Sequence, residues 1–284
     1  MFNTIRFLSV ILVVLSSNLN AEDGSDASHP IHLASYNVRY ATLGDGVNWW
    51  GKRRESVSKY LTKLDIFGLQ EVTHQQLIEL REDLNHFEHY GVGRDDGEHK
   101  GEHAVIFYRS SRFQKLSEGT FWLSSQPSRV GEAGWDAALP RTCTWLKIKD
   151  IQTGKKFVIG NTHFDHRGSE ARLKSSRLIR KRLLDLAGEC PIVLVGDFNC
   201  VPGSDPYAEL LAGMKLKDAK HVSLQSPQGP DSTWNGFDKI IPGRRIDYVF
   251  VSDQVRVMEY VVDDPRTPQG RFASDHLPVR VVLE

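Results

Sequence analysis

The chain has 284 residues, of which 40% are hydrophobic and 25% are charged, and 36 Lys and Arg residues balance 36 Asp and Glu residues. This length and composition suit one large α/β domain or two small ones. The zero formal net charge excludes a global electrostatic attraction to nucleic acid, so any polyanion must be held by a local patch. Cys143, Cys190 and Cys200 lack metal-ligand spacing and cannot pair completely, which leaves one disulfide or none.

Residues 1–21 are predicted to be a secretory signal peptide. Arg6 supplies the positive start, residues 7–15 form an apolar core, and Ala21 is a small residue at the cleavage point. The apolar run is too short to span a bilayer comfortably, so we expect no stable membrane insertion; the alternative is an uncleaved anchor. Residues 22–30 are predicted to be a flexible lead-in and residues 31–284 one domain. We therefore expect a secreted or periplasmic protein.

From residue 31 onwards, apolar runs alternate with helical periodicities. Strands are expected at residues 31–38, 65–71, 104–108, 120–123, 142–149, 155–160, 192–195, 245–251 and 279–283. Helices are expected from Lys52 to about residue 64, over residues 77–84, from Ser169 to a stop at Gly188, and from Asp205 as an N-cap with Pro206 in the first turn. This alternation, without a break in composition, predicts one α/β domain.

The strand expected at residues 192–195 ends in the sequence Gly-Asp-Phe-Asn. Its four consecutive apolar residues are typical of a strand that is buried on both faces. In an extended backbone, the spacing of two would place Asp197 and Asn199 on the same side. The alternative is an ordinary turn, because both residue types favour turns.

Polar residues also stand at or just past the ends of the other expected strands. Together with Asp197 and Asn199 they are Asn37, Glu71, His163, Asp247, Asp275 and His276. Strand ends on one rim of packed sheets can converge on a single cleft. Carboxylate, carboxamide and imidazole groups serve hard-cation binding and proton transfer. The pattern therefore predicts one polar site at a rim of the fold.

Six stretches resemble, in order, the signature motifs of the endonuclease/exonuclease/phosphatase superfamily, which includes deoxyribonucleases, sphingomyelinases, inositol-polyphosphate phosphatases and polyadenylate-shortening nucleases. They are Asn37, Gln70-Glu71, Asn161-Thr-His163, Gly196-Asp-Phe-Asn199, Arg245-Ile-Asp-Tyr248 and Ser274-Asp-His276. Further stretches, at residues 134–141 and 164–167, resemble a branch of secreted bacterial members. The resemblance implies a four-layer α/β sandwich, with two packed mixed β-sheets flanked by helices.

The resemblance also implies a Mg²⁺ ion, for which Mn²⁺ could substitute. Glu71 would be its principal ligand, with help from Asn37 and Asp275. Such a small protein ligand set is sufficient because Mg²⁺ keeps several waters and binds substrate oxygens. Asp247 would orient His276, which would act as a base or hold the scissile phosphate.

The remaining catalytic roles implied by the resemblance fall on three residues. His163 would contact the phosphate or protonate the leaving oxygen, and its presence distinguishes this chain from the apurinic endonucleases. Asp197 and Asn199 would position the attacking water and the pentacovalent phosphate. Phosphoryl transfer needs mainly positioning and charge neutralisation, so this division of roles is physically sufficient.

Four further residues are predicted to bind substrate. Glu102 resembles the acidic residue that orients the first histidine in deoxyribonucleases, and Arg141 resembles their phosphate-binding arginine. His166 is interpreted as a second phosphate contact, with an ordinary surface-loop histidine as the alternative. Trp234 resembles an aromatic residue of the substrate groove, although a core tryptophan is equally consistent with the sequence.

The sequence thus predicts a secreted, monomeric, Mg²⁺-dependent phosphoesterase that hydrolyses a phosphodiester or phosphomonoester by in-line attack of water. Neutral charge disfavours a nuclease acting on long duplexes, whereas Arg141, Arg167 and Arg245 near the cleft would suffice for a compact phosphorylated substrate. A polyadenylate-type ribonuclease is a further enzyme option. The non-enzyme alternative is a catalytically degenerate member that acts as a binding protein.

Overall fold

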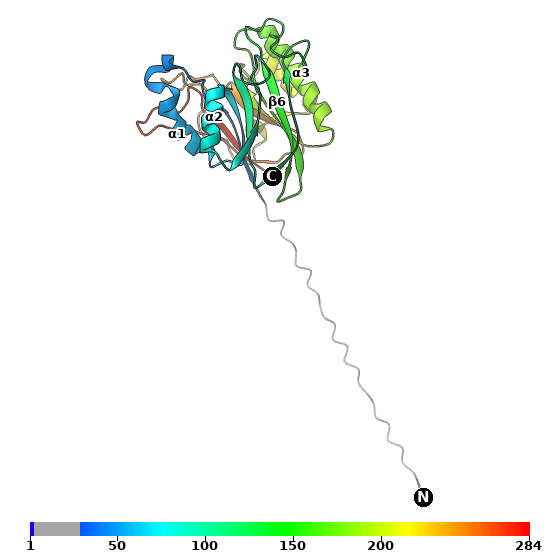
Figure 1. The fold of residues 1–284 in the computed structure, drawn as a ribbon. Helices are drawn as coiled ribbons and strands as arrows, with labels where there is room; N and C mark the ends of the chain where they lie inside the picture. The colour runs from blue at the N-terminus through cyan, green and yellow to red at the C-terminus, as the bar shows by residue number, and fades with distance from the viewer. Residues whose placement is uncertain (3–28) are drawn as a thin grey trace.

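Two β-sheets pack face to face, with helices on their outer surfaces, in a computed structural model that describes residues 1, 2 and 29–284 (Figure 1). The arrangement confirms the predicted four-layer α/β sandwich. Apart from residues 1 and 2, the predicted signal peptide lies outside the described residues, as does the predicted lead-in up to residue 28. Among the described residues, no helix has the length and apolar character needed to cross a membrane.

Each sheet has six strands and is mixed. The first sheet has the order β11-β12-β1-β2-β4-β3, and the second has the order β5-β6-β7-β8-β10-β9. The first contains β1 (Ile31–Asn37), β2 (Ile66–Val72), β3 (Phe87–Tyr90), β4 (His103–Arg109), β11 (Val257–Val262) and β12 (Val279–Leu283). The second contains β5 (Phe113–Trp122), β6 (Thr142–Asp150), β7 (Lys156–His163), β8 (Ile192–Asp197), β9 (Lys217–Asp218) and β10 (Asp247–Val251). Only the β1–β2 and β7–β8 pairs are parallel among the described strand pairs.

Helices cover the outer face of each sheet. The helical segments are η1 (Leu43–Asn48), α1 (Trp50–Leu61), α2 (His74–Asp83), α3 (Ser169–Ala187), α4 (Asp205–Leu211), η2 (Ala212–Met214) and α5 (Ala219–Val222). In Figure 1, α1 and α2 lie on one side of the sandwich and α3 on the other. As predicted, α3 starts at Ser169, and Gly188 follows it with a left-handed φ of 61°. A residue without a Cβ adopts that φ at little cost.

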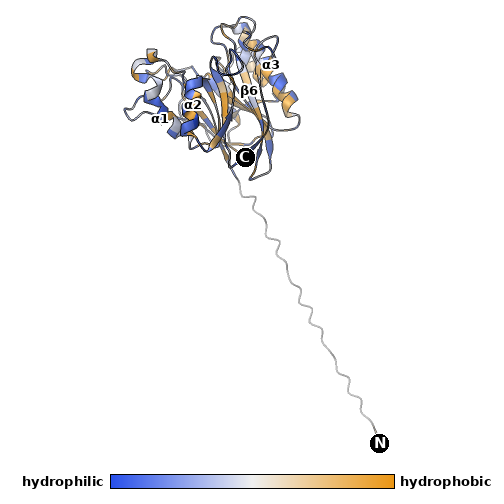
Figure 2. Cartoon of the chain, in the orientation of Figure 1, coloured by the Kyte–Doolittle hydropathy of each residue, from blue (hydrophilic) through white to orange (hydrophobic). Residues whose placement is uncertain are grey.

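Three layers of apolar side chains hold the sandwich together, and hydrophobic residues are concentrated along the strands (Figure 2). Leu33 points into the layer between the sheets, whereas the next residue, Ala34, points toward α1 and α2. In β8, Val193 and Val195 face the layer between the sheets, and Leu194 faces α3. Successive residues of β8 thus point to opposite faces of the sheet, and both faces are buried, as the continuous apolar run at residues 192–195 predicted.

Several expectations for individual elements need correction. β5 begins at Phe113, well before the predicted start at residue 120, and β3, β9 and β11 were not predicted. Asp205 is the first residue of α4, and the N-cap is Ser204. β3, β9 and β11 were missed because they are short or amphipathic, so the apolar signal of each is weak. All three cysteines are free, and Cys143 and Cys200 are buried.

Candidate active site

The site lies at the rim where β1, β2, β7 and β8 end and β10 begins. In the parallel β7–β8 pair, His163 stands opposite Asp197, and in the antiparallel β8–β10 pair, Asp197 stands opposite Asp247. In the other sheet, Asn37 at the end of β1 pairs with Gln70. The rim is remote from the opposite edge, where Ile31 pairs with Leu283. Strand register alone therefore gathers the polar residues of both sheets at one edge.

A β-bulge directs Glu71 into the site. Leu69 pairs with Val105 and Val72 pairs with His103, so two residues of β2 oppose the single residue Ala104. Glu71 is the second residue of this bulge and has a left-handed φ of 60°. Bulges re-aim side chains and are common next to active sites, where such backbone strain is tolerated for function.

Asn37 joins the two sheets within the site. Its Nδ2 donates hydrogen bonds to Glu71 Oε1 and to Asp197 Oδ2, each at 3.0 Å. Its Oδ1 accepts a hydrogen bond from the backbone N–H of Arg39 at 3.0 Å. The amide therefore holds two carboxylates from different sheets at a fixed separation. In this arrangement Asn37 presents N–H groups to the carboxylates, and its role as a metal ligand stays a prediction.

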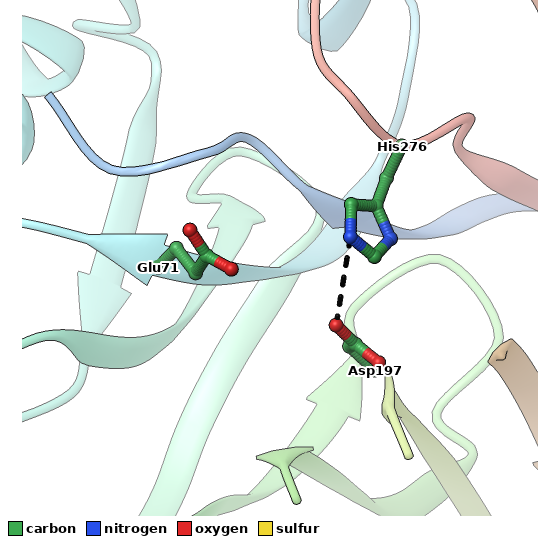
Figure 3. A group of neighbouring side chains, drawn as sticks. All are labelled: Glu71, Asp197 and His276. Atoms are coloured by element: carbon green, nitrogen blue, oxygen red, sulfur yellow. Dashed lines mark ion pairs between the residues drawn. The ribbon is translucent and has the colours of Figure 1, made fainter. Parts of the chain in front are cut away.

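Asp197 lies between two histidines, of which His276 is drawn beside it in Figure 3. Its Oδ2 is 3.4 Å from His163 Nε2 and 3.8 Å from His276 Nε2. His276 Nδ1 donates a hydrogen bond to Asp247 Oδ2 at 2.9 Å, as the prediction for Asp247 and His276 requires. Asp247 is fully buried, and its backbone N–H donates to Thr233 Oγ1. Asp247 thus orients the imidazole of His276 toward Asp197.

Burial and neighbouring charges shift the pKa values of His163 and His276 in opposite directions. Burial, followed by the positive charge of Arg141, lowers the pKa of His163 well below its usual value. Burial also acts to lower the pKa of His276, but the carboxylates of Asp247 and Asp197 outweigh it and raise that pKa well above its usual value. The surroundings therefore favour the neutral form of His163 and the protonated form of His276.

The carboxylates of the site are suited to a hard cation. Ligand atoms of Glu71, Asp197 and His276 lie within 4.8 Å of one another. Burial, and in addition the charge of Glu71, raises the pKa of Asp275, and burial with Asp247 raises that of Asp197 to about 7. Burial is the larger cause of both shifts, and the neighbouring carboxylates add to it. Because Mg²⁺ prefers oxygen ligands and a protonated imidazole has no free lone pair, the carboxylates fit the ion better than His276 does.

Asp275 lies at the edge of this group. Its Oδ1 accepts a hydrogen bond from Ser274 Oγ at 3.3 Å, and its Oδ2 is 3.9 Å from Arg39 Nε. The same Arg39 side chain is 3.9 Å from Glu71 Oε2 and forms a bidentate contact with Asp45. Arg39 therefore brings a positive charge close to the two carboxylates among the predicted metal ligands.

The expectation that Asp197 and Asn199 share one side of an extended strand is wrong. β8 ends at Asp197, and Asn199 has a left-handed φ of 47°. Asp197 Oδ1 accepts a hydrogen bond from the Asn199 backbone N–H at 3.0 Å, while Asn199 Nδ2 donates to Phe164 O at 3.1 Å. This local turn, the alternative recognised from the sequence, competes successfully with the extended conformation.

Three of the predicted substrate-binding residues, Glu102, Arg141 and His166, form a chain of contacts that starts at His163. Glu102 Oε2 is 3.7 Å from His163 Nδ1 and 4.0 Å from Arg141 Nη1. Arg94 binds the same carboxylate in a bidentate contact, at 2.7 and 3.1 Å. Arg141 Nη2 in turn lies 3.1 Å from His166 Nδ1. A small cavity is lined by Arg94, Glu102, Arg141 and His163 among others.

Trp234 and Arg245 were both expected near the substrate, and the structure treats the two expectations differently: one stays a prediction and one is corrected. Trp234 is half-buried, forms an isolated bridge with His276, and lies under the guanidinium of Arg244. Its role in binding substrate stays a prediction. Arg245, expected near the cleft, is buried, and its Nη1 donates to Asp218 Oδ2 at 2.7 Å. Because Asp218 occupies its guanidinium, Arg245 is corrected to a residue that stabilises the fold.

Sequence reasoning assigned no role to the side chains that lock the sheets together beneath the site. Fully buried Asn161 donates from Nδ2 to Leu69 O and to Val105 O, both at 2.9 Å, and accepts from Gln70 Nε2 at 2.7 Å. Gly68 lies next to it, and a Cβ there would be 2.7 Å from Asn161 Cγ. The sequence did contain a signal for this contact, because Gln70 and Asn161 are amide residues within largely apolar strands.

The fold and the site agree with a comparison against known families. The model of the endonuclease/exonuclease/phosphatase family matches residues 34–276. The chain therefore belongs to this family. The match includes Asn37 and Glu71 near its start and Asp275 and His276 at its end, so it spans both sheets and the whole rim described above.

Solved structures extend this assignment. An endonuclease/exonuclease/phosphatase from Bacteroides vulgatus is similar, with 39% identity and a TM-score of 0.86 over 90% of this chain and 99% of that chain. A mannosyl-6-phosphatase from Bacteroides thetaiotaomicron has 36% identity and a TM-score of 0.84, over 89% and 99% of the two chains. The human nocturnin catalytic domain, at 18% identity and a TM-score of 0.71 over 90% and 93%, shares the fold.

Two curated relatives from Drosophila melanogaster are more distant and longer. Protein angel of Drosophila melanogaster is 30% identical over 195 residues, which cover 63% of this chain and 51% of that protein. Nocturnin of the same organism is 21% identical over 299 residues, covering 87% and 45%. The chain spans about half the length of these curated relatives.

Proposed function

We propose that the protein is a secreted, divalent-metal-dependent phosphoesterase that hydrolyses a P–O bond by in-line attack of water. The observation that carries the proposal is the pair of contacts made by Asn37, which holds Glu71 of one sheet and Asp197 of the other around one point. A carboxylate suited to a cation therefore lies beside a carboxylate flanked by two histidines. Phosphoryl transfer requires this combination of charge neutralisation and positioning.

Glu71, with Asp275, would hold the Mg²⁺ ion, which Mn²⁺ could replace. When bound, the ion supplies positive charge for the phosphate oxygens. His276, oriented by Asp247, would donate a hydrogen bond to a non-bridging phosphate oxygen. His163 would contact the phosphate from the other side of Asp197.

Asp197 would orient the attacking water. Its Oδ1 is occupied by the Asn199 N–H, and its Oδ2 is anchored by Asn37 and faces both imidazoles. A water held at such a fixed carboxylate is aligned for attack on phosphorus, which lowers the entropic cost of the reaction. Asn199 keeps Asp197 in place through this backbone contact.

For the substrate, we propose a phosphomonoester of a sugar. The similarity to a mannosyl-6-phosphatase, which covers 89% of this chain at 36% identity, supports this class. The balance of 36 basic and 36 acidic residues supports it too, because a long polyanion requires several phosphate contacts. Arg141 lies near His163 through Glu102, and its Nε and Nη1 atoms, which have no hydrogen-bond partner among the described residues, offer donors for one phosphate.

The test is hydrolysis by the purified protein, with and without Mg²⁺, of mannose 6-phosphate, phenyl phosphate, bis(p-nitrophenyl) phosphate, plasmid DNA and single-stranded RNA. We expect release of inorganic phosphate from the monoesters, and its loss in Glu71→Gln and His276→Ala. Glu189→Gln, at an exposed glutamate outside the site, is the matched control. Cleavage of nucleic acid alone would show that the protein is a nuclease and that a sugar phosphate is not its substrate. Inactivity on every substrate would support the binding-protein alternative.

A further inference from the structure

His166 and Arg141 form a pair at the edge of the site. His166 follows β7 and is exposed, whereas Arg141 is buried, with only 4% of its surface accessible. Arg141 Nη2 lies 3.1 Å from His166 Nδ1. A guanidinium can only donate hydrogen bonds, so Nδ1 must be the acceptor and the proton of the neutral imidazole must be on Nε2. The contact therefore selects one tautomer.

Burial and the same arginine both disfavour the charged form of the ring. Burial, followed by the positive charge of Arg141, lowers the pKa of His166, against the opposing effect of Asp165. Within the part of the chain that the structure describes, the Nε2 atom has no hydrogen-bond partner from the protein. His166 therefore offers a neutral N–H donor at the rim.

The turn that carries His166 is held rigidly. Asp165 Oδ1 accepts hydrogen bonds from the backbone N–H groups of Arg167 and Gly168, at 2.9 and 2.7 Å. Asp136 accepts from two N–H groups of the first turn of α3 and packs against Gly168, where a Cβ would be 2.5 Å from its Oδ1. A group fixed in this way binds without a large loss of conformational entropy.

Arg141 also connects this turn to the reaction site. Its Nε and Nη1 atoms are buried and have no hydrogen-bond partner among the described residues. Nη1 is 4.0 Å from Glu102 Oε2, and that oxygen is 3.7 Å from His163 Nδ1. A buried cation with free donors thus lies between the exposed His166 and the His163 that contacts the phosphate in the proposed function.

We propose that His166 Nε2–H donates a hydrogen bond to an uncharged oxygen of the sugar, a hydroxyl or the ring oxygen, in the leaving group of the phosphomonoester. This inference rests on the proposed function and adds a leaving-group subsite to it. A neutral donor is matched to a neutral acceptor, whereas a second phosphate is bound more strongly by a cation. The proposal thus favours a sugar contact over the second-phosphate interpretation of His166.

The test compares kcat/KM of the full protein on mannose 6-phosphate and on phenyl phosphate, whose leaving group has no hydroxyl or ring oxygen. We expect His166→Leu to lower kcat/KM about tenfold on mannose 6-phosphate, the effect of one lost hydrogen bond, and by less than about twofold on phenyl phosphate. His166→Gln retains an N–H donor and should restore most of the activity. His221→Leu, at another exposed histidine, should leave both substrates unaffected.

Several results would overturn the inference. An equal loss on both substrates would mean that His166 either contacts the phosphate or stabilises the fold. Thermal unfolding of the variant would distinguish these two roles. No loss on mannose 6-phosphate would remove the sugar contact. A larger loss on fructose 1,6-bisphosphate than on mannose 6-phosphate would restore the second-phosphate interpretation. If the wild-type protein hydrolyses phenyl phosphate but not mannose 6-phosphate, the inference fails while the phosphoesterase remains; if it hydrolyses neither, the proposed function fails as well.

Discussion

Asn37 Nδ2 lies 3.0 Å from Asp197 Oδ2, although 160 residues separate them in the chain and they belong to different sheets. The same nitrogen donates to Glu71 Oε1. One carboxamide therefore sets the distance between the predicted metal ligand and the carboxylate that faces both histidines. The catalytic arrangement depends on how the two sheets are packed, and this relationship leads to the first prediction.

Asn37→Ala should lower kcat/KM by about 100-fold, because Glu71 and Asp197 lose their shared donor and move apart. The variant should remain folded, since the strand pairing of β1 does not involve the side chain. Steady-state kinetics and circular dichroism check both points. Asn85→Ala, at an exposed asparagine, is the control. Activity within about twofold of wild type in Asn37→Ala would show that the bridge has no catalytic role.

Asn161→Leu should reduce the free energy of unfolding by about 3 kcal/mol, because the carbonyls of Leu69 and Val105 and the amide of Gln70 lose a buried partner. Urea unfolding measures the loss. The double variant Gln70→Leu/Asn161→Leu should be destabilised by less than the sum of the single changes, since the two amides share one hydrogen bond. Additive losses would mean that the two side chains act independently.

Chelation of divalent ions should abolish activity, and added Mg²⁺ or Mn²⁺ should restore it. Because the ion binds the folded protein, Mg²⁺ should also raise the melting temperature. At a Mg²⁺ concentration 100 times the dissociation constant, the free energy of unfolding should increase by about 2.7 kcal/mol. Glu71→Gln should lose most of this shift, whereas Glu189→Gln should keep it. An equal shift in both variants would place the ion elsewhere.

His89 should make stability depend on pH in the mildly acidic range. Its ring stacks on Phe107, with centroids 5.2 Å apart, and burial, followed by the charges of Arg81, Lys115 and His103, lowers its pKa to about 4 despite the opposing Glu88. An unfolded histidine has a pKa of about 6.5. The unfolded state therefore binds more protons below that pH, and stability present above pH 6.5 should decline as the pH falls toward 4.

Urea unfolding at pH 7.5 and pH 5 tests this effect. His89→Phe keeps the stacking and removes the titration, so its stability should change less between the two pH values than that of the wild type. His221→Phe, at an exposed histidine, serves as the control. An identical pH dependence in His89→Phe and the wild type would contradict the prediction.

The sequence by itself determined most of the strands and the longer helices of the sandwich, and which polar side chains stand at the strand ends. Apolar runs identified the four strands that form the two parallel pairs, although not how they pair, and the stop at Gly188 marked the end of α3. These features are local, because they depend on the spacing of neighbouring side chains and on the conformational preferences of single residues.

Only the tertiary structure decided how these residues meet. The bulge that re-aims Glu71 arises from the register between β2 and β4, which no spacing within β2 reveals. The buried bridge of Asn161 and the pairing of Arg245 with Asp218 depend on which surfaces pack together. Periodicity defines the face on which a side chain lies, but its partner on that face is decided by sheet order, register and packing between distant segments.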